Sequence, residues 1–483
     1  MKPCALPLWH LIRPPQIFVF KNHLGGFSGA PRKIGKIMAF DMQKWLTDQA
    51  ITEVECLVSD ISGIPRGKIL PLKKFVSAQD TGGLRLPEYV FGQAVTGEYY
   101  DSDVLNEIGS DVVLIPDPNT CRLVPWYDEP TAQIIHDAVS QDGSLVPFTA
   151  RAVLKRVLAL FEDAGLEPVI APELEFFLVK QSNDANSPLI TPTGRSGRAE
   201  KAKQAYGIDA VNEFDPLFEE IYDHCDVQGL DIDTLSHEAG AAQMEINFNH
   251  GSALELADQA FLFKRTVRQT AINHGLHATF MAKPMQEQPG SAMHIHISVR
   301  SKKTGKNIFA NTDGTESDDF YHSLAGMQRY LSGAMALMAP YVNSYRRRTG
   351  TEDSPANLAW GMDNRTVGLR VPIGAADSRR IENRIPGADA NPYLAIAATL
   401  AAVWLGLQEK RRPTRPRKVS GEDLETLPRN LDVALDALER AKALHPVLGE
   451  DFVKLFVEVK RAEAEAFLEV ISPWEREYLL LNV

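Results

Sequence analysis

The chain has 483 residues, a formal net charge of −12, a sequence pI near 5.6 and a hydrophobic content of 44%. This length predicts more than one domain, and the composition is typical of a globular protein with a sizeable core. The acidic balance argues against nucleic acid as the main partner. No stretch approaches the ~18–20 apolar residues that would span a membrane. The four cysteines are scattered and form no C-x-x-C pair, so we expect free thiols and a cytoplasmic protein.

Residues 1–37 differ in composition from the rest of the chain. They contain lysine, arginine and proline but no acidic residue, and their apolar pieces are too short and too broken by proline for a secretory signal. An organelle transit segment is one interpretation. We favour a disordered tail, or an upstream start codon with Met38 as the true beginning.

Residues 38–145 are predicted to form one domain, rich in strands with short helices. Taken in chain order, its predicted elements are a helix at 41–49 and strands at 53–59, 68–71 and 111–117. A turn-forming group at 116–119 and the loop at 141–144 mark its end. We therefore place a domain boundary near residue 145.

Residues 146–483 are predicted to form a second domain in which long helices alternate with strands. The predicted helices cover 150–164, 253–274, 318–338 and 393–408, followed by a helical tail from 421. The predicted strands cover 169–179 and 277–283, and residues 181–202 are expected to be an exposed loop. Neither strict βαβ alternation nor a G-x-G-x-x-G motif is present, so the pattern predicts an α+β fold.

Two glutamates lie on the predicted strand at 169–179. Glu173 and Glu175 are two residues apart, so they project from the same face of the strand, roughly 6–7 Å from each other. Such a pair repels itself and is costly to bury without a cation, a shared proton or an arginine. An isolated E-x-E is more often a solvent-facing edge, so the pair needs support from elsewhere in the chain.

Three further stretches carry similar patterns. Glu238 and Glu245 lie seven residues apart, and alternation in two short strands places two sets of side chains each on a common face: His294 with His296, and Arg380 with Glu382 and Arg384. Each stretch alone would pass for a half-exposed strand. Five glutamates and a histidine in one pocket, however, cannot stay ionised without metal, and this donor set suits Mg²⁺ or Mn²⁺. Divalent ions beside several arginines are suited to phosphate chemistry, and no Walker A motif is present.

Several spaced motifs together resemble those of class I glutamine synthetases, in the same order and over residues from about 50 to the C-terminus. The matching segments are Ala278-Thr279-Phe280-Met281-x-Lys283-Pro284, Gly290-Ser291-x-Met293-His294-x-His296-x-Ser298, Asn343-Ser344-Tyr345-x-Arg347, Asn364-Arg365, Arg370-x-Pro372, Arg380-Ile381-Glu382-x-Arg384 and Ala390-Asn391-Pro392-Tyr393.

The resemblance implies an N-terminal β-grasp domain and a C-terminal catalytic domain built on a curved antiparallel sheet. It also implies a dodecamer of two stacked hexameric rings, with each active site shared between neighbouring subunits. The implied substrates are L-glutamate, ATP and an amine or ammonium, with two or more Mg²⁺ or Mn²⁺ ions per site.

The resemblance also implies roles for individual residues. One metal ion would be held by Glu175, Glu238 and Glu245, and a second by Glu173, His294 and Glu382. Glutamate would be held by Gly290, Arg347 and Arg384. The nucleotide and the transferred phosphoryl group would contact Arg365, Arg370, Arg380, His296 and Ser298, with Arg365 as a catalytic residue.

Two departures from the family fall on the pocket for the attacking amine. Glutamine synthetases carry Phe-Asp-Gly-Ser-Ser, whose aspartate binds ammonium, whereas the stretch Tyr89 to Ala94, which includes Gly92 and Gln93, has no acid at the matching place. The family's flap Pro-Gly-Tyr-Glu-Ala-Pro aligns with residues 350–355, where Glu352 and Asp353 are the candidates for the catalytic base. Neutral drift is one interpretation. The other is an ammonium cage opened to admit a larger amine.

Glutamate–amine ligases that make γ-glutamylputrescine lack the same Phe-Asp-Gly-Ser-Ser motif. They share with this chain the turn at 67–71, the run from Trp360 to Thr366 and the run from Gly387 to Leu394. The segment 423–428 has no tyrosine for regulation by adenylylation. We therefore expect an ATP-dependent ligase that joins the γ-carboxylate of glutamate to a diamine, polyamine or monoamine, in catabolism of that amine. The alternatives are an authentic glutamine synthetase and a non-catalytic ring-forming protein with a structural or regulatory role.

Overall fold

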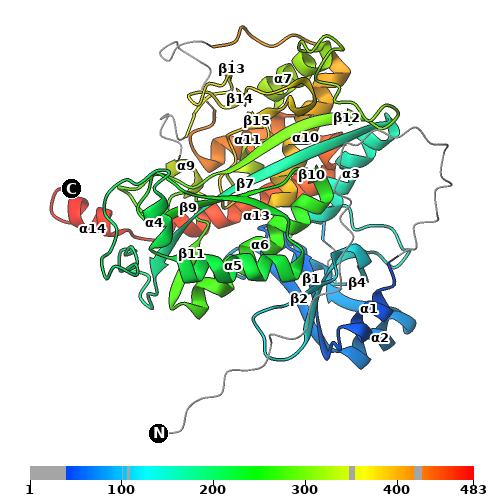
Figure 1. Cartoon of the computed structure of the whole chain (residues 1–483), viewed down its shortest axis with the longest axis vertical. Coiled ribbons are helices and arrows are strands. Elements are labelled where there is room, and N and C mark those ends of the chain that lie inside the picture. Colours follow the sequence, from blue (N-terminus) through cyan, green and yellow to red (C-terminus); the bar gives the residue numbers. More distant parts are fainter. Residues whose placement is uncertain (1–39, 101, 106–108, 348–353, 418–426) are drawn as a thin grey trace, which may run out of the picture. The chain divides into compact units, whose positions relative to one another are not determined.

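The computed structural model describes residues 40–100, 102–105, 109–347, 354–417 and 427–483. The predicted basic extension, the flap residues Glu352 and Asp353, and the segment 423–426 lie outside the described residues. Helices and strands both build the rest, which confirms the α+β class (Figure 1). In the described part of the chain, none of the helices combines the length and the apolar character that a bilayer crossing needs.

A first, mixed sheet is formed by the N-terminal part of the described chain. Its strands are β1 (Glu53–Ser59), β2 (Pro65–Pro71), β3 (Leu84–Pro87), β4 (Asp111–Pro116), β5 (Arg122–Leu123) and β6 (Thr131–Val139). They lie in the order β2-β1-β6-β4-β3, with β5 on β6; β1 and β6 are parallel and the other pairs antiparallel. The helices α1 (Met42–Asp48) and α2 (Leu72–Asp80) accompany it, with the short η1 (Glu88–Gly92) and η2 (Pro118–Thr120).

A second sheet of nine strands carries the candidate site and confirms the prediction of a curved, mainly antiparallel sheet. Its strands are β7 (Leu166–Lys180), β8 (Ile232–His237), β9 (Gln243–Phe248), β10 (Gly251–Ser252), β11 (Leu276–Thr279), β12 (Met293–Ser301), β13 (Trp360–Met362), β14 (Leu369–Val371) and β15 (Ile381–Asn383). The order is β13-β14-β15-β12-β7-β9-β8, with β10 and β11 also on β7. The long strands β7 and β12 cross the centre of Figure 1. The predicted boundary near residue 145 falls between the two sheets and stays a prediction.

The helices of the second part are α3 (Ala150–Asp163), α4 (Ile208–Asn212), α5 (Asp215–Gln228), α6 (Ala253–Asn273), α7 (Asp318–Tyr330), α8 (Met335–Met338), α9 (Ser344–Arg347), α10 (Pro392–Glu409), α11 (Leu431–Arg440), α12 (His445–Leu448), α13 (Glu450–Leu468) and α14 (Pro473–Leu479), with η3 (Ala376–Ser378). The apolar helix α10 packs against α3, α6 and α7. Its start follows from its sequence, because the Asn391 side chain accepts from the backbone of Tyr393 and Pro392 occupies the first turn. Glycine permits close contact between α10 and α7, since a Cβ on Gly406 would lie 2.3 Å from the carbonyl oxygen of His322 on α7.

Two predicted elements are wrong in extent. The helix predicted over 318–338 is interrupted after Tyr330, and Gly333 in the break approaches the C-terminal segment so closely that a Cβ there would lie 2.7 Å from the Cβ of Ala441. The strand predicted over 277–283 ends at Thr279. Beyond it the backbone N–H of Lys283 donates to the side chain of Asn343 instead of to a neighbouring strand.

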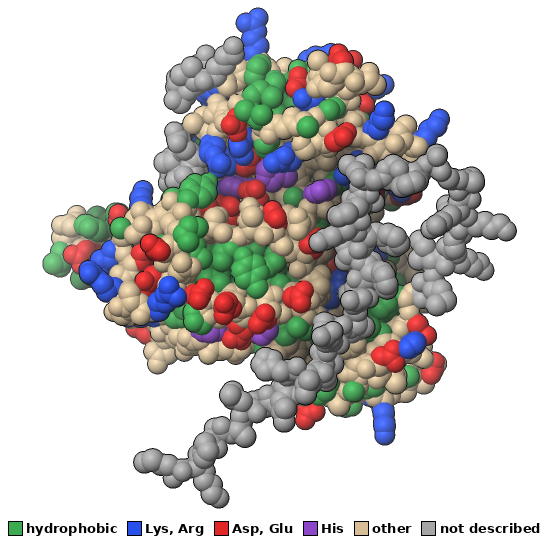
Figure 2. Space-filling view, in the orientation of Figure 1, with side chains coloured by type: hydrophobic (Ala, Val, Ile, Leu, Met, Phe, Trp, Pro, Cys, Tyr) green, Lys and Arg blue, Asp and Glu red, His purple; other side chains and the backbone are tan. Residues whose placement is uncertain are grey.

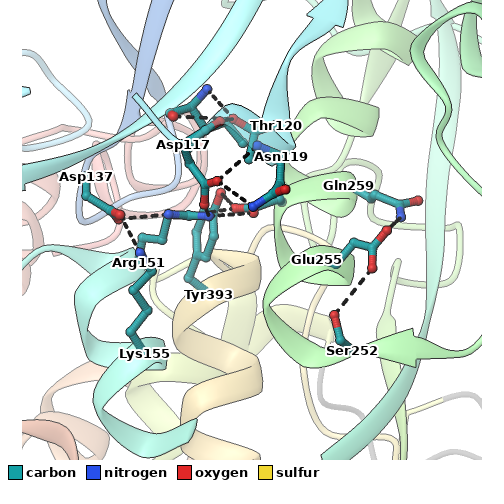
Figure 3. Close-up of polar contacts among 12 residues, drawn as sticks. Asp117, Asn119, Thr120, Asp137, Arg151, Lys155, Ser252, Glu255, Gln259 and Tyr393 are labelled. Carbon is teal, nitrogen blue, oxygen red and sulfur yellow. Dashed lines mark hydrogen bonds and ion pairs between the residues drawn. The ribbon is translucent and has the colours of Figure 1, made fainter. Parts of the chain in front are cut away.

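A buried ion cluster joins the first sheet to the helices around α10 (Figure 3). The guanidinium of Arg151 on α3 is 2.6 Å from an Asp117 oxygen, 2.8 Å from Asp137 and 2.9 Å from both oxygens of Asp258 on α6. The hydroxyl of Tyr393 on α10 donates to Asp258 at 2.7 Å. Burial alone would disfavour the charge of Arg151, but these carboxylates raise its pKa. The positive charge of one arginine therefore balances the negative charges of three aspartates from different parts of the chain.

A buried histidine makes the stability of this sheet depend on pH. His136 on β6 is 2% exposed, its Nδ1 lies 2.9 Å from the Ile134 carbonyl oxygen, and burial lowers its pKa to about 4. The unfolded chain takes up this proton nearer pH 6.5. The contribution of His136 to the free energy of unfolding is therefore fully present above that pH and falls by roughly 3 kcal/mol as the pH decreases towards 4.

We expect His136→Gln to lose less stability than the parent chain between pH 7 and pH 4.5. The measurement is urea unfolding at several pH values, with the exposed His250→Gln as the control. If the parent and His136→Gln variants lost stability equally on acidification, burial of this imidazole would not be the cause.

Candidate active site

The strand β7 lies in the middle of the candidate site and places its two glutamates opposite different partners. Glu173 is paired across the sheet with His294 on β12 and with Asn247 on β9, and Glu175 is directly opposite Glu245 on β9. Cross-strand neighbours share a face of the sheet. The alternation in the sequence and the register of the strands thus gather these side chains on one face.

The first group of metal-ligating atoms consists of Glu173, His294 and Glu382, whose donor atoms lie within 4.8 Å of one another. Nδ1 of His294 lies 3.3 Å from a Glu173 oxygen and 3.8 Å from a Glu382 oxygen. The other nitrogen of His294, Nε2, is buried without a hydrogen-bond partner among the described residues. These are the three residues expected to hold the second metal ion.

A second group consists of Glu175, Glu245 and His294, again within 4.8 Å. It contains two of the three residues expected around the first metal ion, and His294 is common to both groups. Glu238 follows β8, and its backbone N–H donates to the Gln243 carbonyl oxygen at 2.8 Å. Its charge contributes to the raised pKa of both Glu175 and Glu245, which places it close to them.

The carboxylates of the two groups differ in their pKa values. Burial and the charge of Glu238 raise the pKa of Glu175 to about 8, and burial with three neighbouring glutamates raises that of Glu245 well above its usual value. Burial alone would also raise the pKa of Glu173 and Glu382. Nearby histidines nevertheless hold the pKa of Glu173 well below its usual value, and with Arg384 they lower that of Glu382 to about 2.

The residues present fit divalent cations. Oxygen donors dominate, with one imidazole nitrogen that lacks a partner, which is the donor set that Mg²⁺ and Mn²⁺ take. The crowded carboxylates Glu175 and Glu245 cannot both be ionised cheaply unless a cation lies between them. The donor set formed by Glu173, Glu175, Glu245, His294 and Glu382, with Glu238 beside them, could hold such ions, and the metal-ligand assignment stays a prediction.

Basic side chains adjoin the first group on the side of β14 and β15. Arg370 donates to Glu382 at 2.6 Å and to Asp363 at 2.6 Å, and Arg384 donates to Glu382 at 2.7 Å. Further along β12, Nε2 of His296 lies 2.8 Å from Glu173, and Nδ1 accepts from Nε of Arg380 at 3.0 Å. Ser298, two residues further along β12, is half-buried. On the face in Figure 2, acidic, basic and histidine side chains gather in one hollowed region.

The residues expected to hold glutamate are brought together by close packing. A Cβ on Gly290 would lie 2.4 Å from Cγ of Arg347, so only glycine permits this contact. Arg347 is 3% exposed, and its guanidinium donates to the carbonyl oxygen of Ile385 at 3.0 Å and to that of Arg384 at 3.3 Å. Gly290, Arg347 and Arg384 therefore form one contiguous group.

The remaining predicted site residues belong to other segments of the chain. Arg365 is exposed in the turn after β13, and Glu352 and Asp353 lie outside the described residues. Gly92 is held between Leu105 and Leu455, either of which would be 3.2 Å from an added Cβ, and Gln93 donates to the Gly97 carbonyl oxygen at 2.6 Å. Within the described ranges, no recorded contact links Gly92 or Gln93 to the metal-ligating groups.

Two residues of the site are missing from the sequence-based prediction. Gln243 donates from Nε2 to Glu175 at 3.2 Å and to the Gly290 carbonyl oxygen at 3.0 Å. It therefore links the metal-ligating residues to the residues expected to hold glutamate. Asn247 lies opposite Glu173, and its Oδ1 is buried without a partner among the described residues. Both share the face of Glu245 on β9 by two-residue alternation, and that signal would have found them.

Comparison with known proteins gives the family. The profile "glutamine synthetase, catalytic domain" matches residues 148–479. The chain is 34% identical to the γ-glutamylputrescine synthetase PuuA of Escherichia coli (strain K12), over 93% of this chain and 96% of that protein. It is 32% identical to the glutamate–isopropylamine ligase of a Pseudomonas species, over 86% and 92%. Glutamine synthetases match at similar identity.

The solved structures agree with the sequence comparison. The structure of apo GmaS without ligand aligns with a TM-score of 0.80 at 28% identity, over 92% of this chain and all of that one. The matches extend over both sheets of the described chain. The protein is therefore a member of the glutamine synthetase family and an ATP-dependent ligase.

Proposed function

We propose that the protein joins the γ-carboxylate of glutamate to an organic amine (a diamine, polyamine or monoamine) in amine catabolism. The observation that carries the proposal is the segment Tyr89 to Ala94, which has no acid where glutamine synthetases bind ammonium. The stretch contains Gly92 and Gln93 instead, and the side-chain amide of Gln93 donates to the Gly97 carbonyl oxygen. The names of two relatives, a γ-glutamylputrescine synthetase and a glutamate–isopropylamine ligase, support the same substrate class.

The first step of the proposed reaction activates glutamate. An oxygen of the γ-carboxylate attacks the γ-phosphorus of ATP, so that γ-glutamyl phosphate forms and ADP leaves. Glutamate would be held beside the metal-ligating groups by Arg347, Arg384 and the backbone at Gly290. Arg365, Arg370 and Arg380, with His296 and Ser298, would bind the nucleotide and balance the charge of the phosphoryl group in transfer. Bound Mg²⁺ or Mn²⁺ would supply further positive charge to the phosphate oxygens.

The second step forms the amide. The amine nitrogen attacks the acyl carbon, the bond to phosphate breaks, and the proton that the nitrogen then loses leaves with the phosphate. Because alkylamines are mostly protonated at neutral pH, a base must first remove a proton from the bound ammonium form. We propose Glu352 or Asp353 of the flap for this role.

We further propose that the amine pocket is completed by a neighbouring subunit in a dodecamer of two hexameric rings. Gly92 and Gln93 contact Leu105, Leu455 and Gly97 of their own chain and have no recorded contact with the carboxylate groups in the described ranges. A neighbouring copy is the simplest source of this segment at each site. Sedimentation of the purified protein tests the assembly.

The acceptor is tested by ADP release with glutamate and a series of amines. We expect putrescine, spermidine or a simple alkylamine to give a higher kcat/KM than ammonium. A much higher kcat/KM for ammonium would instead establish an authentic glutamine synthetase. Absence of both Mn²⁺ binding and ATP turnover would favour a non-catalytic ring protein.

A substitution at residue 92 tests the segment itself. Gly92→Asp restores an acid, so we expect its kcat/KM for ammonium relative to putrescine to rise by about tenfold, the effect of roughly 1.4 kcal/mol on one substrate. Gly92→Asn is the matched control, because it has the same contacts with Leu105 and Leu455 but no charge. Equal ratios in the two variants would show that the missing carboxylate does not select the amine.

A further inference from the structure

Asp389 is a half-buried acid that the proposed mechanism does not use. It lies between β15 and α10, in the segment Gly387-Ala388-Asp389, where the backbone passes so close that a Cβ on Gly387 would be 2.5 Å from Oδ1 of Asp389. That Oδ1 is buried without a hydrogen-bond partner in the described part of the chain, while Oδ2 accepts from the Ser344 hydroxyl at 2.6 Å. A buried carboxylate oxygen without a hydrogen-bond partner costs free energy, so its presence here needs an explanation.

The partner of Asp389 begins the single helical turn that ends in Arg347. Ser344 is 2% exposed, and its hydroxyl oxygen also accepts from the backbone N–H of Tyr341 at 3.0 Å. Its hydroxyl hydrogen is therefore directed to Asp389, and the start of α9 is fixed at this point. Arg347 lies three residues further, about one turn along the helix.

The other end of the turn is tied to the same segment. The guanidinium of Arg347 donates to the carbonyl oxygens of Ile385 and Arg384, which precede Asp389 by a few residues. The charge of Asp389 is also balanced by Arg347 and by Lys264 of α6, whose ammonium donates to the Ala390 carbonyl oxygen at 2.7 Å. The stretch 384–390 thus holds α9 at its first residue and at its last.

We infer that Asp389 is a positioning residue for glutamate binding, which acts through Ser344 to fix the turn that carries Arg347. The inference rests on the proposed role of Arg347 in holding glutamate. In the proposed mechanism Asp389 has no contact with substrate or phosphate. Without its hydrogen bond, the turn would start at a freely rotating hydroxyl, and Arg347 would lose its fixed orientation.

The test is a double-mutant cycle of Asp389→Ala and Ser344→Ala, measured by steady-state kinetics with glutamate and with ATP varied separately. Hydrogen bonds to charged groups are stronger than those between neutral groups. Loss of the bond between Ser344 and Asp389 should therefore lower kcat/KM for glutamate roughly tenfold in each single variant. KM for ATP should stay within about twofold. The double variant should lose no more than either single variant, because both changes remove the same interaction.

Rescue and controls separate a positioning role from a structural one. Asp389→Asn keeps an oxygen that accepts from Ser344 and should recover most of the loss for glutamate. The exposed loop variant Asp142→Ala should match the parent chain. Additive losses in the cycle, or equal changes in the KM values of glutamate and ATP, would overturn the inference. If the parent chain shows no glutamate-dependent ATP turnover, the proposed function fails instead, which the same assay reveals before any variant is made.

Discussion

Replacing Glu175 by glutamine should lower glutamate-dependent ATP turnover by more than the ~10–100-fold that loss of a group behind a metal ligand costs. Glu175 is 7% exposed and lies within 4.8 Å of the Glu245 and His294 donor atoms. The same change should leave the metal-free protein at least as stable as the parent. Burial and the charge of Glu238 already disfavour the ionised form of Glu175, and the amide removes that charge while its oxygen still accepts from Ala292.

The two effects are measured together by ADP release and by thermal melting with EDTA or with Mn²⁺. The parent chain should melt higher with Mn²⁺, and Glu175→Gln should lose most of this increase. Glu167→Gln, at an exposed position of the same strand, is the matched control. A variant that melts far below the parent in EDTA would indicate that Glu175 is a structural carboxylate and not a metal ligand.

Replacing Arg151 by methionine should destabilise the protein by about 3–5 kcal/mol, the usual cost of breaking a buried ion pair by removing one partner. Arg151 is 4% exposed and is the shared partner of Asp117, Asp137 and Asp258. Without the guanidinium, three acids from three elements would repel one another in a buried site. The measurement is urea unfolding of parent and variant under identical conditions.

Lys155→Met is the matched control for Arg151→Met. Lys155 also pairs with Asp137, but its side chain is 26% exposed and it has one acidic partner in the cluster. Because Lys155 reaches solvent and its charge can be hydrated, we expect its loss to cost about 1 kcal/mol, near the upper end for surface ion pairs. If both variants unfolded at the same urea concentration, the cluster would not be what joins the first sheet to α3, α6 and α10.

The sequence predicts the long elements of the fold well, and the structure shows why the shorter ones are less certain. The helices α3, α6 and α10 agree with prediction within a few residues, because their apolar spacing and caps are local signals. The break between α7 and α8 has no such signal. It depends on the approach of Gly333 to Ala441, more than a hundred residues away in the sequence, which only the tertiary structure determines.

In the candidate site too, local pattern predicts some features and only the tertiary structure determines the others. Alternation along a strand predicts that Glu173 and Glu175 share a face, as do His294 and His296. Which residues lie opposite them depends on strand register, which a single sequence does not specify. The resemblance to glutamine synthetases supplied the ligand sets, and the structure adds that His294 belongs to both groups. Alternation along β9 places Gln243 on the face of Glu245, but its partner Glu175 lies on another strand. The contact of Asp389 with Ser344 likewise joins segments distant in sequence, so neither partner could be inferred from local pattern.

We propose that Glu173 and Glu175 take part in the activation of glutamate, and that the segment at Gly92 and Gln93 selects the amine. The most direct test is a competition in one vessel, with glutamate, ATP, Mg²⁺ and equal concentrations of ammonium, putrescine, spermidine and an alkylamine, and mass spectrometry of the products. We predict that the γ-glutamyl amide of one of the organic amines accumulates ahead of glutamine. Glutamine as the dominant product would contradict it.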